Sequence, residues 1–298
     1  MPGLRLQGSS AIVTGGGSGL CLVFAKQLHA RGCNVLIADI GLRPEAEVFI
    51  ESAAANNGTK VTFQKTDVTD WEQLERMFSV AEELFGTTPD LVCAGAGVYE
   101  PPGASFWADK DKASHYKILD INLIHPIKTT RIAIRQMLKH KKRGCIVHVS
   151  SLACETASLI TPLYSVSKHG VAAFVRGLAD LESKCGIRVA CVAPGSIKTP
   201  LMLEDPRVSS WLNPQKDYIL DPAVVASAMM AVVENTEDKY PAGIILEVTE
   251  AEEEKWRLVP LYNNPGPQGR AGKISNKDDG LKDIEKILEQ DAGFKVSI

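Results

Sequence analysis

The sequence has no long apolar run, little cysteine and almost no net charge. None of its apolar runs approaches the roughly 18 to 20 residues of a membrane span, and its first residues lack the apolar core of a secretory signal. We therefore expect no membrane span. The 33 Lys and Arg residues nearly balance the 36 Asp and Glu residues, which leaves a net charge of −3. Nucleic-acid binders usually carry a strongly basic domain or patch, so no nucleic-acid partner is expected.

Cysteine is too sparse for a disulfide scaffold. The seven cysteines form no Cys-x-x-Cys pair and mostly lie inside apolar runs. We interpret them as reduced, buried thiols of an intracellular, cytoplasmic protein. The six histidines show no metal-ligand spacing with cysteine or carboxylates, which argues against a zinc site. No metal is expected.

Short apolar runs recur along the chain, separated by longer stretches of helical character. Runs that are apolar on both faces and alternate with helices predict a parallel sheet covered on both sides. The fold class is therefore α/β, with a doubly wound parallel sheet in a single domain. The runs are residues 11–13, 35–38, 61–63, 91–94, 145–149, 189–192 and 244–248.

The composition changes at residues 263–269, which read as a break. We divide the chain there into a domain of residues 1–262 and a C-terminal extension of residues 263–298. Within the extension, Leu281, Ile284, Ile287 and Leu288 have helical spacing, which predicts a short amphipathic helix over residues 279–290. We expect this helix to pack near the substrate loop of its own domain or on a neighbouring subunit.

A glycine-rich turn joins the first apolar run to a helix. Glycines at such a turn let the backbone approach a pyrophosphate, and the helix presents free N–H groups and its positive dipole end. The second run ends at Asp39, 24 residues after Gly15. A carboxylate there accepts hydrogen bonds from both ribose hydroxyls of NAD and repels the 2′-phosphate of NADP. The nearby Arg43 softens this preference, so NADP stays an alternative, as does a purely structural turn.

Tyr164 and Lys168 lie four residues apart and share one face of a predicted helix. A nearby ammonium favours phenolate over phenol, so we expect Lys168 to lower the pKa of the Tyr164 phenol from its ordinary value of about 10. Such a tyrosine exchanges a proton with an alcohol or carbonyl oxygen while hydride moves at the adjacent carbon. Ser151, 13 residues before Tyr164, is placed to hydrogen-bond the same oxygen.

Together these residues resemble the classical short-chain dehydrogenase/reductase family, in the correct order over residues 5–250. The resemblance implies a Rossmann fold with strand order 3-2-1-4-5-6-7 and a catalytic group of Asn122, Ser151, Tyr164 and Lys168. In this group Tyr164 is the acid or base and Ser151 orients the substrate oxygen. Lys168 binds the nicotinamide ribose and lowers the tyrosine pKa, and Asn122 holds a water in the proton relay.

The resemblance also implies the contacts of the dinucleotide. Asp67 and Val68 are expected at the adenine, and the segment from Pro194 to Thr199 at the nicotinamide carboxamide and phosphate. The full set of cofactor-binding residues that we predict is Gly15, Gly17, Ser18, Gly19, Leu20, Asp39, Asp67, Val68, Ala96, Gly97, Tyr164, Lys168, Pro194, Gly195, Ile197 and Thr199.

Two positions depart from the family pattern. Cys21 stands where the last glycine of the glycine-rich motif is expected, so helix and strand must pack around a thiol. After the fourth run, residues 94–97 read Ala-Gly-Ala-Gly instead of Asn-Asn-Ala-Gly, which removes two amides that normally tie strands together. These departures favour an alternative reading, a catalytically silent nucleotide-binding scaffold, against which the intact Ser151, Tyr164 and Lys168 argue.

The substrate loop of the family corresponds to residues 201–220, which are rich in apolar and aromatic side chains. With Tyr99, Phe106 and Trp107 they predict a lipophilic pocket. We expect a secondary alcohol or ketone of secondary metabolism, such as a polyketide, terpenoid, steroid or fatty-acid derivative. Residues 98–101 and 125–127 look most like hydroxyprostaglandin dehydrogenase-type and fungal members. The resemblance implies a homodimer or homotetramer, and an NADP(H)-dependent biosynthetic ketoreductase is the other alternative.

Overall fold

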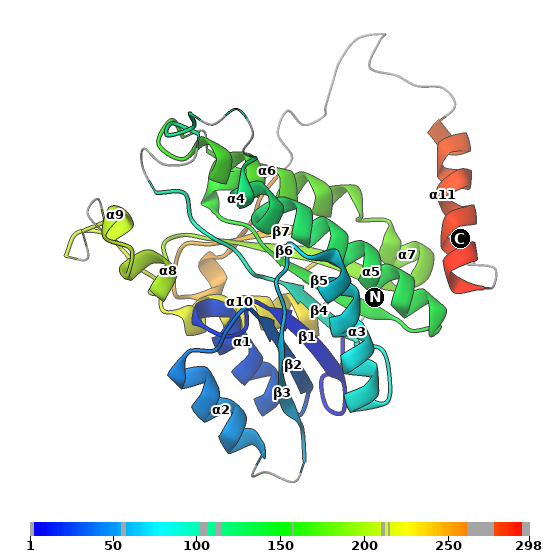
Figure 1. Cartoon of the computed structure of the whole chain (residues 1–298). Helices are drawn as coiled ribbons and strands as arrows, with labels where there is room; N and C mark the ends of the chain where they lie inside the picture. The colour runs from blue at the N-terminus through cyan, green and yellow to red at the C-terminus, as the bar shows by residue number, and fades with distance from the viewer. Residues whose placement is uncertain are drawn as a thin grey trace.

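The structure is a computed structural model (Figure 1). It describes residues 3–54, 58–101, 106–110, 112, 115–156, 158–209, 212–213, 215–260 and 277–293, without the side chains of residues 207, 209 and 277–280. Among these residues, no helix is long and apolar enough to cross a bilayer.

A central sheet of eight strands organises the domain, in the order β3-β2-β1-β4-β5-β6-β7-β8. The first seven strands are parallel, so the predicted strand order is confirmed. The strands are β1 Ser10–Thr14, β2 Asn34–Asp39, β3 Val61–Lys65, β4 Leu91–Ala94, β5 Gly144–Val149, β6 Ile187–Pro194, β7 Ile245–Val248 and β8 Arg257–Leu258.

The last strand was not predicted. β8 is two exposed residues long and pairs antiparallel with β7, where Arg257 lies opposite Glu247. Arg257 also forms ion pairs with Glu247 and, at 3.1 Å, with Glu155. Because β8 is held by edge pairing and surface charge, it carries no apolar run that would mark it in the sequence.

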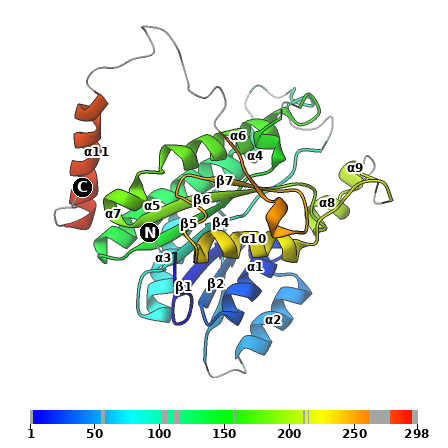
Figure 2. The ribbon, with the colours of Figure 1, turned by 180° about the vertical axis from the view of Figure 1, so that it is seen from behind.

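Helices cover both faces of the sheet, as Figures 1 and 2 show. Helices α1, α2 and α10 pack on one face, and α3, α5 and α6 pack on the other. Successive residues of a strand alternate between the two cores, so Val13 and Ile12 belong to opposite ones. The helices are α1 Gly19–Ala30, α2 Pro44–Ala54, α3 Trp71–Phe85, α4 Lys117–Leu119, α5 His125–Lys139, α6 Pro162–Gly177, α7 Leu181–Cys185, α8 Pro200–Leu203, α9 Pro206–Ser209, α10 Pro222–Glu234 and α11 Lys277–Ala292.

Local signals set the ends of these helices. The Asp70 carboxylate accepts hydrogen bonds from the N–H groups of Glu72 and Gln73 at the start of α3, and Gly86 ends that helix in the left-handed conformation. Between α4 and α5 the chain forms a π-helical turn, η1 Asp120–Ile124, and a 3-10 turn, η2 Leu152–Cys154, follows β5. A further 3-10 turn, η3 Glu253–Lys255, precedes β8. Both η1 and η2 adjoin the site described below.

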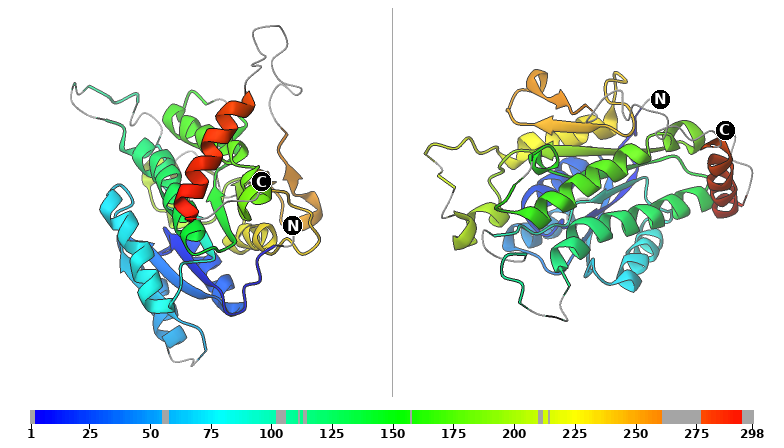
Figure 3. Two further views of the ribbon diagram at one scale, coloured as in Figure 1. Left: turned by 90° about the vertical axis from the view of Figure 1, so that its right-hand side faces the viewer. Right: turned by 90° about the horizontal axis from the view of Figure 1, so that it is seen from above.

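The C-terminal helix α11 packs on its own domain, beside α5 and α7 (Figures 1 and 3). It lies at the opposite end of the molecule from α8 and α9, so the expected contact with the substrate loop is wrong. Asp291 pairs with Arg131 of α5 at 2.6 Å, and Glu285 pairs with Lys184 of α7 at 3.2 Å. These two ion pairs fix the helix on the face of the domain remote from the substrate loop.

The buried face of α11 differs from the predicted stripe. Leu288 and Ala292 are each 6% exposed, whereas Ile284 is 50% and Ile287 is 44% exposed. The face that contacts the domain runs through Glu285, Leu288 and Ala292, so charge pairing and apolar contact share one side of the helix.

Leu288→Ala should lower the free energy of unfolding by about 2 kcal/mol, because it removes a buried side chain at the contact with the core. Ile284→Ala, the matched control on the exposed side of the same helix, should change it by less than about 0.5 kcal/mol. Urea unfolding followed by circular dichroism measures both. Equal effects of the two substitutions would contradict the orientation of α11.

Candidate functional site

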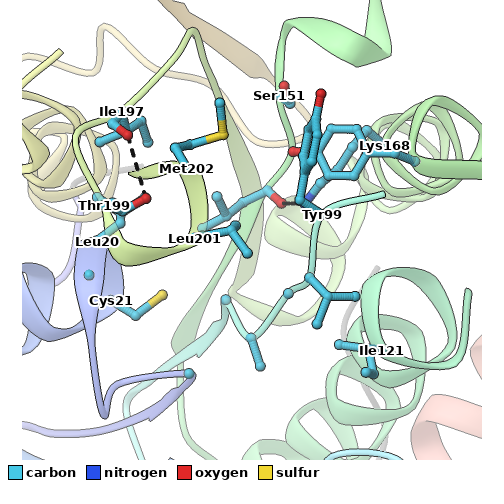
Figure 4. Close-up of a pocket in the computed structure, with 18 of the residues that line it drawn as sticks. Leu20, Cys21, Tyr99, Ile121, Ser151, Lys168, Ile197, Thr199, Leu201 and Met202 are labelled. Atoms are coloured by element: carbon cyan, nitrogen blue, oxygen red, sulfur yellow. Dashed lines mark hydrogen bonds between the residues drawn. The ribbon is translucent and has the colours of Figure 1, made fainter. Parts of the chain in front are cut away.

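A cavity of about 560 Å³ lies at the carboxyl ends of the parallel strands. Its walls come from the segments that follow β1, β2, β3, β4, β5 and β6, together with residues of α6 and α8. In Figure 4, Tyr99, Ser151 and Lys168 gather on one wall, with Leu201 and Met202 opposite. Ligands of doubly wound folds bind at this edge of the sheet, so the cavity is the candidate active site.

The glycine-rich turn after β1 is packed too tightly for side chains. Gly15 has a φ of 73°, and a Cβ on it would lie 2.7 Å from the Cα of Ala96. A Cβ on Gly17 would lie 2.2 Å from the carbonyl oxygen of Gly41. The Ser18 side chain makes no capping hydrogen bond, which leaves the first amides of α1 available to an anion. The turn therefore fits a pyrophosphate.

Asp39 lies at the end of β2 beside this turn. Its carboxylate accepts hydrogen bonds from the N–H of Gly17 at 2.9 Å and from the N–H of Ile40 at 2.7 Å. Arg43 was expected to soften the preference for NAD over NADP, but its side chain binds Glu204. Its guanidinium binds both carboxylate oxygens of Glu204, at 2.8 and 2.5 Å, at the end of α8.

Ser151, Tyr164 and Lys168 meet on the cavity wall. Helix α6 carries Tyr164 and Lys168 one turn apart, and the Lys168 ammonium lies 5.4 Å from the centre of the Tyr164 ring. Ser151 follows β5 and hydrogen-bonds the Tyr164 phenol. Lys168 donates a hydrogen bond to the carbonyl oxygen of Val149 at 2.9 Å. The structure thus brings together the three predicted residues that handle a proton.

The electrostatics of this group differ from the expectation. Burial raises the pKa of Tyr164 to about 12, and the hydrogen bond with Ser151 lowers it only in part. Burial also lowers the pKa of Lys168 to about 8. The expected lowering of the tyrosine pKa by Lys168 is therefore wrong for the protein alone, because the desolvation of the phenolate dominates and only the hydrogen bond with Ser151 acts against it. At neutral pH the phenol holds its proton.

Asn122 lies outside the cavity, in the π-helical turn η1, and is 1% exposed. Its side-chain oxygen accepts a hydrogen bond from the N–H of Val98 at 2.9 Å, and its side-chain nitrogen donates one to the carbonyl oxygen of Val98 at 2.8 Å. Both polar ends of the amide are thus engaged by the segment after β4. The side chain holds that segment in place and does not reach the cavity.

Most predicted cofactor-binding residues line the cavity. Gly17 is the exception, because it lies under Asp39 and not at the surface of the cavity. Asp67 accepts hydrogen bonds from the backbone and side chain of Thr69, which hold its pKa below the ordinary value. The lining residues from the predicted set are Gly15, Ser18, Gly19, Leu20, Asp39, Asp67, Val68, Ala96, Gly97, Tyr164, Lys168, Pro194, Gly195, Ile197 and Thr199.

The predicted lipophilic lining is only partly correct. Phe106 and Trp107 are 44% and 50% exposed and do not line the cavity. The Trp107 indole instead donates a hydrogen bond to the carbonyl oxygen of Leu159 at 2.9 Å. Within the substrate loop, Leu201 and Met202 line the cavity, whereas Val208 and Leu212 are buried elsewhere and Tyr218 is exposed; Trp211 lies outside the described residues.

Sequence reasoning missed several wall residues. Ile121, Leu152 and Ala153 complete the apolar side of the cavity, and Lys117 stands near Asp67. It also missed Glu100, a buried carboxylate in contact with α6. A glutamate directly after the aromatic Tyr99 and before two prolines is the one signal in the sequence that marks it.

The two departures from the family pattern compensate each other. A Cβ on Gly95 would lie 2.4 Å from the Cys21 Sγ and 3.1 Å from the Cys93 Sγ. The Cys21 thiol therefore occupies the space that a side chain at position 95 would need. The Thr14 hydroxyl oxygen accepts hydrogen bonds from the N–H groups of Gly95 at 3.0 Å and of Ala96 at 3.2 Å.

A buried histidine completes this junction. The His125 Nε2 lies 3.1 Å from the Thr14 hydroxyl, and its Nδ1 lies 3.0 Å from the carbonyl oxygen of Ile121. Burial lowers the pKa of His125 to about 4, so the ring is neutral and links β1 to η1 as a hydrogen-bonding group. No group of three or more metal-ligating side chains gathers anywhere in the described part of the chain.

Gly95→Ala should destabilise the protein by about 1 to 3 kcal/mol, because the new methyl group overlaps the Cys21 thiol. Adding Cys21→Ala should recover at least about 1 kcal/mol relative to the sum of the two single changes. Gly177→Ala, whose Cβ meets nothing within 4 Å, is the control. Thermal unfolding of the four variants gives the coupling energy between positions 21 and 95. Strictly additive effects would show that the Cys21 thiol does not occupy the space that a side chain at position 95 needs.

Comparisons with known proteins agree with this site. A sequence model of the family described as short chain dehydrogenase matches residues 9–207. The chain is 32% identical over 251 residues to (+)-borneol dehydrogenase 1 of Salvia officinalis, covering 81% of this chain and 92% of that protein. It is 28% identical over 263 residues to 15-hydroxyprostaglandin dehydrogenase [NAD(+)] of Bos taurus, covering 83% and 92%.

A solved structure, that of gox2181, superposes with a TM-score of 0.70 at 28% identity, covering 82% of this chain and 95% of that one. The matched segment includes the glycine-rich turn, Ser151, Tyr164 and Lys168. The chain therefore belongs to the short-chain dehydrogenase family and is an oxidoreductase acting on CH–OH groups.

Proposed function

We propose that this protein is an NAD(H)-dependent oxidoreductase that interconverts a lipophilic secondary alcohol and its ketone. The observation that carries the proposal is the cluster of Ser151, Tyr164 and Lys168 on one wall of a cavity that continues to the glycine-rich turn and Asp39. The relatives that are named as dehydrogenases of borneol and of 15-hydroxyprostaglandin support an alcohol as substrate.

The cavity fits a nicotinamide dinucleotide. The amides at the start of α1 would bind the pyrophosphate, Asp39 the ribose hydroxyls, and Asp67 and Val68 the adenine side. Lys168 would donate to the second ribose. When bound, the nicotinamide would supply the hydride acceptor for the alcohol carbon or the hydride donor for the ketone carbon.

The residues of the chain handle the proton. The Ser151 hydroxyl donates a hydrogen bond to the substrate oxygen and orients it toward Tyr164. In the direction of reduction, the Tyr164 phenol, which is protonated at neutral pH, gives its proton to that oxygen. In the direction of oxidation it takes the proton back. Asn122 acts at a distance, by holding the segment that begins at Val98.

The walls nearest to Tyr164 favour an apolar substrate. The Tyr99 ring lies 4.8 Å from the Tyr164 ring, and Ile121, Leu152, Leu201 and Met202 supply aliphatic surface around it. Such a lining desolvates a hydrocarbon skeleton and offers few partners to the hydroxyls of a sugar. We therefore propose a terpenoid, steroid, polyketide or fatty-acid derivative.

The preference for NAD over NADP rests on two carboxylates. Asp39 repels a 2′-phosphate, and Glu204 holds the Arg43 guanidinium that would otherwise neutralise that phosphate. The backbone N–H of Arg43 donates a hydrogen bond to the carbonyl oxygen of Gly17, and the N–H of Gly17 donates one to Asp39. Arg43 and Asp39 therefore lie at the same turn. This arrangement argues against the NADP(H)-dependent ketoreductase.

We also propose a cytoplasmic homo-oligomer. All seven cysteines are free thiols, as in a reducing compartment. Val166 on α6 and Ile124 beside α5 are 53% and 39% exposed, so these two helices present apolar side chains that a subunit contact would cover. Sedimentation equilibrium measures the mass that decides the oligomeric state.

Tyr164→Phe should reduce turnover by about 10² or more, because it removes the proton that is transferred. NADH affinity, measured by fluorescence titration, should stay within about twofold. Turnover is measured on a panel of lipophilic secondary alcohols with NAD and of ketones with NADH. Tyr240→Phe, which removes a hydroxyl bound to Glu253 outside the cavity, is the control. A wild-type protein that binds NADH but turns over no member of the panel would support the silent scaffold instead.

Glu204→Gln should tighten NADPH binding by about three- to tenfold and leave NADH binding within about twofold, because it releases Arg43 for a 2′-phosphate. Asp39→Ala should also narrow the difference between the dissociation constants of NADH and NADPH, because it removes the carboxylate that repels the 2′-phosphate. Glu253→Gln breaks a comparable exposed pair with Lys239 and is the control. If Glu204→Gln leaves the ratio of the two dissociation constants unchanged, Arg43 has no part in the choice of cofactor.

A further inference from the structure

The mechanism leaves unused a carboxylate that the structure buries almost completely. Glu100 is 1% exposed and lies in the segment that follows β4. Its Oε2 accepts hydrogen bonds from the N–H groups of Leu163 at 2.9 Å and of Tyr164 at 3.0 Å. Its Oε1 lies 3.5 Å from the N–H of Phe106. The carboxylate thus sits at the N-terminus of α6, the helix that carries the proton-handling residues.

Helix α6 has no cap of its own. Its first residue is Pro162, which has no N–H, and the Thr161 side chain makes no capping hydrogen bond. The Thr161 hydroxyl instead bonds Ser158 at 3.2 Å and takes part in a hydrogen bond with Tyr99. The free amides of the first turn are therefore those of Leu163 and Tyr164, and Glu100 satisfies both. An anion at this end also stabilises the helix dipole.

The two residues before Glu100, Val98 and Tyr99, contact Asn122 and Tyr164 of the predicted catalytic group. Val98 is held by the Asn122 amide through two hydrogen bonds, and the Tyr99 ring packs on the Tyr164 ring at 4.8 Å with an angle of 56°. Three consecutive residues therefore bind Asn122, the phenol ring of Tyr164 and the backbone of Tyr164. We call residues 98–100 the β4 clamp.

We propose that Glu100 is a positioning residue, which holds the backbone of Tyr164 so that the phenol stays aligned with Ser151 and Lys168. The proposal rests on the proposed function, since it concerns the proton that Tyr164 transfers. Proton and hydride transfer tolerate little misplacement, and a shift of about 1 Å can cost up to 10²-fold in rate. A carboxylate bound to the amide of the catalytic residue itself controls that placement directly.

Within the clamp, Glu100 acts on geometry and not on cofactor binding. Glu100 does not line the cavity, and among the described residues its side chain accepts hydrogen bonds from Phe106, Leu163 and Tyr164 and not from the glycine-rich turn. Loss of the carboxylate should therefore change the rate of the chemical step and spare the affinity for NADH. If Glu100 merely stabilised the fold, its substitution would change neither the rate of the chemical step nor the NADH affinity of the molecules that remain folded.

The test compares Glu100→Ala, which removes both acceptors, with Glu100→Gln, which keeps one oxygen for the two amides. Asp70→Ala is the matched control, because one oxygen of Asp70 likewise accepts from two successive amides at the start of α3, a helix without a proton-handling residue. For each variant, single-turnover hydride transfer is measured per NADH-binding site, well below the melting temperature. Amide hydrogen exchange of the peptide containing residues 159–168 is measured in parallel.

We expect Glu100→Ala to slow hydride transfer by at least about tenfold and to speed exchange at Leu163 and Tyr164, with NADH affinity within about twofold. Glu100→Gln should keep the rate within about threefold of wild type, and Asp70→Ala should not change it. An unchanged rate in Glu100→Ala, or unchanged exchange of the first turn of α6, overturns the proposal. If wild type turns over no substrate, the proposed function fails, and the exchange result alone decides whether Glu100 holds Tyr164.

Discussion

The pairing of β1 with β4 is the constraint on which the site depends. These strands lie side by side at the centre of the sheet, with Thr14 opposite Ala94, although the chain between them builds β2 and β3 on the other side of β1. The order of the strands reverses at this point, so the segments leaving β1 and β4 diverge and open a crevice. A Cβ on Gly15 would meet the Cα of Ala96 at 2.7 Å, which shows how closely the two segments approach.

Burial decides the protonation states within this crevice. A phenol with a pKa of about 12 is a proton donor at neutral pH, and a lysine with a pKa of about 8 keeps most of its charge there. These protonation states suit the proposed direction of reduction, in which Tyr164 would give a proton to the substrate oxygen. For oxidation the phenol must first lose that proton, and a positive charge brought beside Lys168 would lower the cost, because positive charge near a phenol favours its anion.

Features that depend on repeated local patterns could be read from the sequence. The parallel sheet, the glycine-rich turn, Asp39 and the trio of Ser151, Tyr164 and Lys168 follow from apolar runs and short motifs at fixed spacing, and the strand order follows from the family resemblance that these motifs carry. Single polar contacts between distant segments could not be read. Glu100 meets α6 across 64 positions, and Arg43 meets Glu204 across 161. Neither contact leaves a periodic signal.

The aromatic residues near the site also show what the sequence alone could not predict. Phe106 and Trp107 have the composition of a lipophilic pocket, yet the fold turns both outward, because Trp107 donates its hydrogen bond to Leu159 on the outer rim. Composition tells which residues favour apolar surroundings, and only the path of the chain decides which of them face the substrate.

The altered junction between β1 and β4 bears on whether the protein is an active enzyme. Replacing a motif glycine by Cys21 and losing two asparagines would each open or crowd the floor of the cofactor site if they occurred alone. Here the thiol fills the space above Gly95, and Thr14 with the neutral His125 binds the amides that follow β4. The substitutions therefore preserve the geometry of the crevice. A fold released from catalysis has no physical need for such matched changes, whereas the proposed enzyme, which would hold Tyr164 opposite a bound dinucleotide, does.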